Sequence, residues 1–369
     1  MNFTMDASTM NQISKNMGSL LGAKTTIPVL TGVLTVVQEN EILFTVSDGA
    51  DTLVQRVMRS DEVEINTTGT TILPKDFFTT VRKMRGQIEV CTEGNIVTVT
   101  KGKTELSFTT MIADEYPKIA EQAPLSQLRY SGPTFKKIVE STAFCAATSE
   151  TRPVLTGVNL KMEGKQQTFV STDSHRLGNI HVLTSDCLEE NTNVNQTIPA
   201  SALTHAAKTF DLSKDVFVVN YKNMVAFVNG NVIYYSRLIE GNFPDTSRLI
   251  PQQFSTELTF NKNELRDTVQ LLKEASQDSV VKFVIDESLF VKISAKNELA
   301  KGNAEVAYGE KIGEDLTISF SSQYFLEALN AIENEIIKIS FCGAMRPFVI
   351  RSSDENDTSL QLILPVRTY

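Results

Sequence analysis

Asp173, Ser174 and His175 stand side by side in the chain and are the residue types of a hydrolytic triad. A triad depends on three-dimensional geometry, because a histidine must reach the serine hydroxyl while the acid orients that histidine. Adjacent side chains on an extended segment point to opposite faces, and Ser174 lacks the flanking glycines of a Gly-x-Ser-x-Gly turn. The run therefore predicts a polar cluster at a strand end, near a binding pocket, and not a nucleophile.

The other familiar catalytic and cofactor motifs do not occur in the sequence. His175, His181 and Cys187 do not follow the spacing of any zinc motif, so we expect no metal site. The cysteines are widely scattered, and we expect them to be buried free thiols. Neither a Walker loop nor a dinucleotide-binding glycine fingerprint is found, so we expect no nucleotide or other cofactor. These observations favour a mechanical role over an enzymatic one.

The elements that must position these residues recur three times along the chain. The first is a polar segment that opens an amphipathic helix after a short strand, at residues 9–21, 134–142 and 263–275. The second is an apolar strand that ends in Ser or Thr, at residues 44–48, 169–173 and 290–295. An Asp follows the first two of these strands and is missing from the third. Such self-similarity predicts a repeated architecture.

A third element, a strand that leads into a second helix, completes each repeat. It lies at residues 72–84, 197–210 and 318–332. Pro74 and Pro199 stand at equivalent junctions, 125 positions apart, and proline suits the first turn of a helix because its missing N–H costs nothing there. The remaining strands follow one another as hairpins, with strong turn signals around Gly94 and Gly230.

Each repeat thus predicts two helices and about eight short strands, which makes the fold class α+β with helices packed on antiparallel sheets. Polar, proline-containing segments separate the repeats. We expect three domains, at residues 1–125, 126–250 and 251–369.

The charge of the chain gives a mixed indication of its partners. A formal charge of −9 argues against nucleic acid, because phosphates bind Lys and Arg. Net charge is a weak exclusion, however, since one face of an acidic protein can be basic. Residues 75–86 carry four basic side chains and one acid. The usual interpretation of such a segment is a solvent-exposed helix face, and the alternative is a surface that faces phosphates.

Five motifs, in order between residues 152 and 367, resemble signatures of the bacterial DNA sliding clamp family, the beta subunit of DNA polymerase III, and the resemblance covers the whole chain. They are RPVLTG at residues 152–157, TDSHRL at 172–177, FPDTSR at 243–248, GAMRPF at 343–348 and LPVR at 364–367. The C-terminal motif is similar to the Gram-positive branch of the family.

The resemblance implies a ring of repeated clamp domains, closed by head-to-tail pairing of two copies. It implies a non-catalytic processivity factor for DNA replication that slides on duplex DNA without sequence preference. Its expected partners are the polymerase catalytic subunit, the clamp loader, and repair and replication proteins that carry short clamp-binding peptides. Neither a leader nor a membrane-spanning run is evident, so we expect a cytoplasmic protein without a membrane partner.

Two other functions stay open at this point. One is a DNA-binding or regulatory protein of the same fold that is not a clamp, and the other is an enzyme of unknown class. The first would need a recognition helix or a sequence preference, and the second a catalytic motif.

The resemblance also implies three sets of site residues. The partner-peptide pocket, between the second and third repeats, would comprise Leu155, Thr172, Ser174, His175, Arg176, Leu177, Pro244, Arg248, Leu249, Leu364, Pro365, Val366 and Arg367. The DNA-contacting residues would be Lys24, Arg82, Lys83 and Arg152. At the dimer interface, Leu106 and Phe108 would meet Leu271 and Leu272 of the other copy, unless all four belong to domain cores.

Ser174 departs from the family pattern, which commonly has glycine at this position. A serine leaves the backbone less free than a glycine does, so we expect a different pocket shape.

Overall fold

The computed structural model describes residues 1–119, 122–183, 193–275 and 279–367. These residues form two compact units. Residues 1–135 and 205–238 make up most of the first unit, and residues 136–183, 193–204 and 239–367 make up most of the second. The units do not follow the predicted repeats, because two sheets each run from one repeat into the next. The expected domain boundaries therefore stay predictions.

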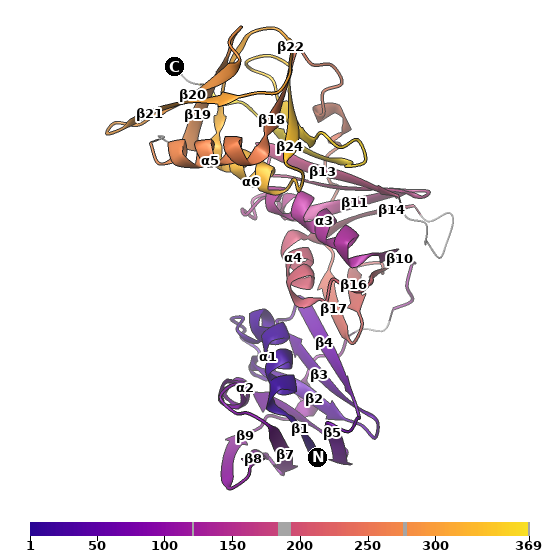
Figure 1. Ribbon diagram of the computed structural model, residues 1–369. Coiled ribbons are helices and arrows are strands. Elements are labelled where there is room, and N and C mark those ends of the chain that lie inside the picture. The colour runs from indigo at the N-terminus through magenta and orange to yellow at the C-terminus, as the bar shows by residue number, and fades with distance from the viewer. Residues whose placement is uncertain (120–121, 184–192, 276–278, 368–369) are drawn as a thin grey trace. The chain divides into compact units, whose positions relative to one another are not determined.

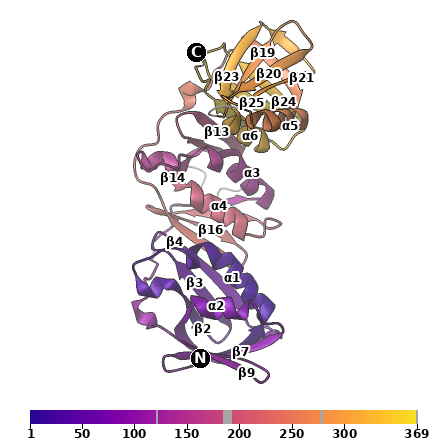
Figure 2. The same cartoon turned by 90° about the vertical axis from the view of Figure 1, so that its left-hand side faces the viewer.

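The first unit contains a five-stranded and an eight-stranded antiparallel sheet, with strand orders β5-β1-β7-β8-β9 and β10-β15-β16-β17-β4-β3-β2-β6. Its first nine strands are β1 (Asn2–Asp6), β2 (Gly32–Val37), β3 (Glu41–Ser47), β4 (Asp51–Met58), β5 (Val63–Thr67), β6 (Gly69–Pro74), β7 (Gln87–Glu93), β8 (Ile96–Lys101) and β9 (Thr104–Thr109). The others are β10 (Ser126–Tyr130), β15 (Val216–Asn220), β16 (Met224–Asn229) and β17 (Val232–Arg237). Helices α1 (Ala7–Leu21) and α2 (Lys75–Val81) lie next to each other over β2 and β3 (Figure 2).

The second unit contains a nine-stranded sheet, β14-β11-β12-β13-β26-β25-β24-β18-β22, and a four-stranded sheet, β21-β20-β19-β23. The strands of its earlier part are β11 (Gly157–Glu163), β12 (Gln166–Thr172), β13 (Arg176–Leu183) and β14 (Val194–Pro199). Those of its later part are β18 (Thr256–Asn261), β19 (Val280–Ile285), β20 (Phe290–Lys296), β21 (Lys301–Ala307), β22 (Lys311–Gly313), β23 (Leu316–Ser321), β24 (Ile336–Phe341), β25 (Phe348–Ser352) and β26 (Ser359–Ile363).

Helices α5 (Lys262–Lys273) and α6 (Ser322–Asn330) pack side by side in the second unit (Figure 1). Two further helices, α3 (Gly132–Thr142) and α4 (Ala200–Thr209), contribute to both units. The α+β prediction with two helices in each repeat is therefore confirmed for the described residues.

Helices α1, α5 and α6 begin where polar side chains cap them. Asp6 accepts the N–H of Ser8 at 2.8 Å before α1, and Asn261 accepts the N–H groups of Asn263 and Glu264 at 3.0 and 3.1 Å before α5. Each bond satisfies a backbone donor that has no partner inside the helix, which stabilises the helix by about 1 kcal/mol. The apolar stripe of α1 is buried as predicted, with Met10, Ile13 and Met17 fully covered.

The two junction prolines lie directly before their helices, as predicted, at the entry to the first turn. Pro74 is the N-cap residue of α2, with ψ at 156°, and Pro199 is the last residue of β14, directly before α4. The N-cap residue has an extended backbone, and its N–H takes no part in the helix, so proline fits there as well as in the first turn.

The three repeats have matching strand registers, which identify equivalent residues. The strand before each second helix ends in the same way, with Pro74 opposite Gly32, Pro199 opposite Gly157 and Ser321 opposite Val280. The hairpin after each Ser- or Thr-ending strand closes with the pairs Ser47–Thr52, Thr172–Leu177 and Lys296–Lys301. Asn297 of the third repeat thus occupies the position of Asp48 and Asp173, although the sequence pattern missed it.

Cys145 is buried as expected, whereas Cys91 and Cys342 are half-buried, because the strands and turn that carry them reach the surface. Cys187 lies outside the described residues. In the part of the chain that the structure describes, no helix is long and apolar enough to cross a membrane.

Candidate functional site

One face of the nine-stranded sheet carries a patch of apolar side chains. Thr172 of β12 lies opposite Leu177 of β13, which lies opposite Leu362 of β26. The buried members of the patch are Val170, Leu177, Val349, Leu360 and Leu362, and Phe243, Ile250 and Phe254 pack against them. The segment that contains these last three residues therefore crosses the sheet face that the predicted pocket residues occupy.

The turn between β12 and β13 is held by the Asp173 carboxylate. Its Oδ1 accepts the backbone N–H groups of His175 and Arg176 at 2.9 and 3.1 Å. The Thr172 hydroxyl donates to the Arg176 carbonyl at 2.6 Å and accepts the N–H of Ser174 at 3.1 Å. The Ser174 hydroxyl is not part of these bonds, so the Asp-Ser-His run is a turn, in agreement with the prediction of a polar cluster at a strand end.

Ser174 adopts a left-handed backbone conformation, with φ at +79°. This region is unfavourable for residues with a Cβ atom and is usually occupied by glycine. Gly49, at the equivalent position of the first repeat, has φ at +97°. The turn thus keeps the glycine-like geometry despite the serine, and its bonds to Asp173 and Thr172 hold the strained residue in place.

The Arg176 side chain links its own turn to the third repeat. Its side chain is only 10% exposed, and the guanidinium donates to Asp173 at 2.9 Å, to the Phe144 carbonyl at 2.6 Å and to Glu327 of α6. It also lies 4.5 Å from the centre of the Tyr324 ring, at cation–π distance. Through these partners, Arg176 holds the β12–β13 turn against α6, and its contact with a peptide stays a prediction.

The C-terminal segment runs beside this turn. The N–H of Leu364 donates to the His175 carbonyl at 2.9 Å, and the N–H of Val366 donates to the Ser319 carbonyl at 2.7 Å. The His175 ring stacks on Tyr324, with ring centres 6.4 Å apart. Leu364 and Val366 remain 37% and 38% exposed, so the segment offers apolar side chains at the surface.

The rest of the predicted pocket set is spread around this centre. Leu155 is buried in the short 3-10 helix before β11, whereas Pro244, Arg248, Leu249 and Arg367 are exposed. The structure therefore joins the β12–β13 turn to the C-terminal segment by hydrogen bonds, and it places Arg248 and Leu249 on the segment that crosses the sheet face.

Comparison with known proteins covers the whole chain. Models of the N-terminal, central and C-terminal domains of the DNA polymerase III beta subunit match residues 1–120, 130–245 and 247–367. The chain is 34% identical to the beta sliding clamp of Bacillus subtilis, with both chains covered completely. It is also 34% identical to that of Staphylococcus epidermidis, over 98% of this chain and 97% of the other.

The chain belongs to the DNA polymerase III beta subunit family, the beta sliding clamps. Solved structures agree with this assignment. The Bacillus subtilis sliding clamp superposes with a TM-score of 0.94 at 32% identity, and the Streptococcus pyogenes beta subunit with 0.94 at 28%, each covering 100% of both chains. The resemblance to Gram-positive clamps is thereby confirmed.

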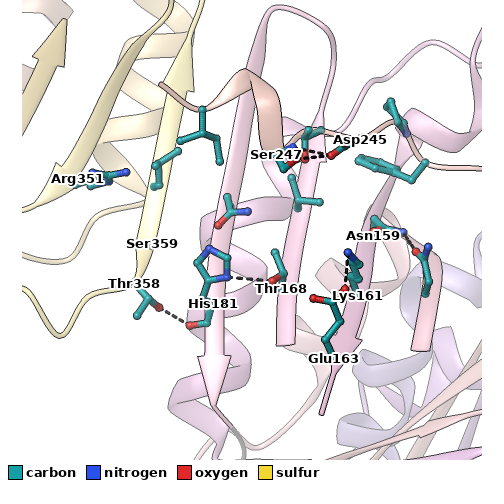
Figure 3. Close-up of a pocket in the computed structure, with 18 of the residues that line it drawn as sticks. Asn159, Lys161, Glu163, Thr168, His181, Asp245, Ser247, Arg351, Thr358 and Ser359 are labelled. Carbon is teal, nitrogen blue, oxygen red and sulfur yellow. Dashed lines mark hydrogen bonds and ion pairs between the residues drawn. The ribbon is translucent and has the colours of Figure 1, made fainter. Parts of the chain in front are cut away.

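A second feature lies further along the same sheet face, and Pro244 is the one predicted pocket residue that lines it. A pocket of about 690 Å³ is lined by strands β11, β12, β13, β25 and β26 and by residues 243–252 (Figure 3). Val170 and Leu360 belong both to its lining and to the apolar patch. The His181 ring bonds the Thr168 hydroxyl at 3.0 Å, and burial lowers the pKa of His181, which favours the neutral ring. The sign of this pocket in the sequence is the alternation of polar residues along β11, which places them on one face of the sheet.

The candidate DNA-contacting residues are all exposed. Lys24 follows α1, and Lys83 follows α2. The Arg82 side chain is held on α1, because its Nε donates to the Ser14 hydroxyl at 2.9 Å and its Nη2 to the Ser14 carbonyl at 3.2 Å. Arg152 belongs to the second unit.

The candidate interface residues divide into surface and core. Leu106 and Phe108 lie on β9, and Leu106 is 39% exposed. Leu271 is 77% exposed on α5, whereas Leu272 is 7% exposed and belongs to the apolar core of the third repeat. The expectation that Leu272 faces a second copy is therefore corrected, since its position on the helix points it at β21 and the core.

Proposed function

We propose that this chain is the processivity factor of a bacterial DNA replicase: a head-to-tail homodimeric ring that encircles duplex DNA and tethers the polymerase. The observation that carries the proposal is the match of three clamp-domain models, in order, along the whole chain. The non-catalytic character and the cytoplasmic location follow from the same family membership and are part of the proposal.

The strand pairing of the repeats supports ring closure by a second copy. Strand β4 of the first repeat pairs with β17 of the second, and β13 of the second pairs with β26 of the third. By register, β21 is the equivalent of β4 and β13, and β9 is the equivalent of β17 and β26. Both β21 and β9 lie at sheet edges. Pairing β21 of one copy with β9 of the other would therefore repeat the two joints already present, and two such contacts would close a ring.

The same equivalence supports Leu106 and Leu271 as contacts across this interface. Within the chain, Gln361 of β26 donates to the Ser141 carbonyl of α3 at 2.9 Å. Leu106 is the register equivalent of Gln361, and Leu271 is the helix equivalent of Ser141, counted from the capping residues Asn261 and Ser131. An apolar pair would thus replace the polar contact at the joint between two copies.

The double variant Leu106→Ala with Leu271→Ala should dissociate the dimer, which sedimentation velocity would record as monomers. Burial of a leucine side chain contributes about 1.5–3 kcal/mol, so the loss of four leucine side chains per ring, two at each interface, is decisive. Leu289→Ala, which changes a leucine that is 73% exposed, is the matched control and should leave the dimer intact. Leu272→Ala should instead destabilise the fold by about 2–5 kcal/mol, because it opens a cavity in the core. A dimer of unchanged stability in the first variant would exclude this interface.

Contact with DNA is expected to be weak and independent of sequence, since sliding requires phosphate contacts without base recognition. Lys24, Lys83 and Arg152 are exposed and accessible for such contacts, whereas the Arg82 side chain is held on α1 by its bond to Ser14. The acidic remainder of the chain would repel DNA elsewhere. Lys24→Ala should reduce loading onto DNA and flatten its salt dependence, and equal loading with an equal salt slope would remove Lys24 from the site.

The partner site would take a short apolar-ended peptide over the β12–β13 turn and the C-terminal segment. The exposed Leu364, Val366 and Leu249 supply apolar contacts for such a peptide. The polymerase, the clamp loader and repair proteins are the expected carriers of such peptides. Calorimetry with a Gln- and Leu-containing peptide should show binding that is lost on deletion of residues 364–369, and full affinity in the deletion variant would place the site elsewhere.

A primer-extension assay with a clamp loader separates this function from the two rivals. A clamp should lengthen the products of a cognate polymerase on any template sequence. Unchanged product length would exclude the clamp function and return the enzyme and the sequence-specific regulator to consideration.

A further inference from the structure

We infer that the charges at two equivalent positions distinguish the three joints between neighbouring repeats of the ring. One position lies on the turn of one repeat, and the other lies on the second helix of the next repeat. At the joint between two copies these positions are the neutral Ala300 and Thr80. The inference rests on the proposed dimer. It concerns which domain edges can pair with which, and it assigns Thr80 and Ala300, neither of them an expected contact, to the interface.

At the first joint, the turn position carries an acid and the helix position a base. Asp51, which begins β4, is 9% exposed and accepts a bond from the Tyr234 hydroxyl at 2.8 Å. The same hydroxyl lies 3.2 Å from Nδ1 of His205, on α4. His205 is the sixth residue after Pro199, and Asp51 is the third after Asp48. A buried carboxylate from the first repeat is thus linked through a phenol to an imidazole of the second.

At the second joint, the polarity is reversed. Arg176, the third residue after Asp173, is 9% exposed and pairs with Glu327 of α6. Glu327 is the sixth residue after Ser321, which is the equivalent of Pro199. The turn therefore contributes the base and the helix contributes the acid, at the same two positions that carry the opposite arrangement in the first joint.

At the third joint, the same two positions are neutral. The third residue after Asn297 is Ala300, and the sixth residue after Pro74 is Thr80. The turn itself is conserved in shape, because Asn297 Oδ1 accepts the N–H groups of Leu299 and Ala300 at 2.8 and 2.6 Å. Ala300 is exposed and Thr80 is half-buried, so both are accessible to a second copy.

The arrangement penalises incorrect pairings. If the turn of the first repeat met α6, Asp51 would face Glu327, and a buried pair of like charges costs several kcal/mol. A neutral turn that met either charged helix would leave His205 or Glu327 without its partner. Ala300 with Thr80 is the combination that buries no charge, so this joint can separate and rejoin without exposing an ion that has lost its counter-charge.

Charge substitution at the neutral pair tests the inference. Thr80→Glu with Ala300→Glu should weaken the dimer by about tenfold or more, since two carboxylates then face each other. Thr80→Glu with Ala300→Arg should restore or exceed the original affinity, and Thr80→Lys with Ala300→Glu should do the same with reversed polarity. Sedimentation equilibrium on the full chain measures all three dissociation constants.

The matched control moves the acid by one residue along α2. Thr79 is exposed, so Thr79→Glu with Ala300→Glu should not weaken the dimer as the Thr80 version does. Equal dissociation constants for the like-charge and opposite-charge pairs at 80 and 300 would overturn the inference while leaving the clamp proposal intact. A parent chain that remains monomeric at every concentration would instead overturn the proposed dimer.

Discussion

The turns after β3 and after β12 use the same hydrogen bonds but carry different side chains. In both, an aspartate accepts two backbone N–H groups, and a hydroxyl from the preceding strand donates to the carbonyl of the residue that opens the next strand. The first turn has Gly49 at the left-handed position and the second has Ser174. The residue after the turn is Asp51 in one and Arg176 in the other, and each is buried against the next repeat.

The groups that shape each turn differ from the side chain that links the turn to the next repeat. The aspartate and the hydroxyl set the local geometry, because their bonds span three or four residues. The residue that begins the following strand determines the contact between repeats, because its side chain reaches the neighbouring repeat. The second turn also lies beside the exposed C-terminal segment, so it combines a domain joint with the proposed peptide site.

Removal of Arg176 should be the most damaging change to either turn. Arg176→Ala leaves Asp173 and Glu327 without their cation and removes the contact with Tyr324, so we expect a loss of about 3 kcal/mol or more in unfolding free energy. Urea denaturation measures this, with Arg248→Ala, at an exposed position, as the control expected within about 0.5 kcal/mol of the parent. Equal stability of the two variants would mean that the second joint does not depend on the ion pair.

Exchange of the residues at the left-handed position should have a smaller, reciprocal effect. Ser174→Gly removes the backbone strain at φ +79° and should stabilise the chain by about 0.5–1 kcal/mol. Gly49→Ser introduces the same strain at φ +97° and should destabilise by a similar amount, since its Cβ would meet nothing closer than 3.8 Å. Thermal unfolding of both variants checks the pair, and changes of the same sign in both would show that side-chain contacts outweigh the backbone.

The smallest effect is expected at Asp51, and it should depend on pH. Burial is the main cause that raises the pKa of Asp51, and Asp48 adds to it, while Ser236, Tyr234 and His205 oppose it. A carboxyl whose folded pKa is raised favours folding when protonated, so its contribution grows as the pH falls from neutral through the raised pKa and is complete below the ordinary value of 3.8.

Asp51→Asn should therefore be as stable as the parent at pH 7, or more stable by up to about 1 kcal/mol, and the difference should shrink toward pH 5. Denaturation of both proteins at the two pH values measures this. A variant that is clearly less stable at pH 7 and unaffected by pH would show that the ionised Asp51 strengthens the first joint, as Arg176 does the second.

The sequence by itself determined the threefold repeat, the α+β class, the helices and the family. These follow from local signals: the apolar stripe of α1, the glycines in the β7–β8 and β16–β17 turns, and the motif around residues 172–177. Each is set by neighbours within a few residues, where periodicity and turn chemistry act directly.

Only the tertiary structure decided what several of those residues do. Arg176 pairs with Glu327, 151 positions away, and Leu272, which was expected at the dimer surface, lies in the core of the third repeat. The pairing of β13 with β26 brings the C-terminal segment to the turn, and no local pattern encodes that register. Partners distant in the chain meet through packing and strand pairing, so a residue's role in such contacts cannot be read from its neighbours in the sequence.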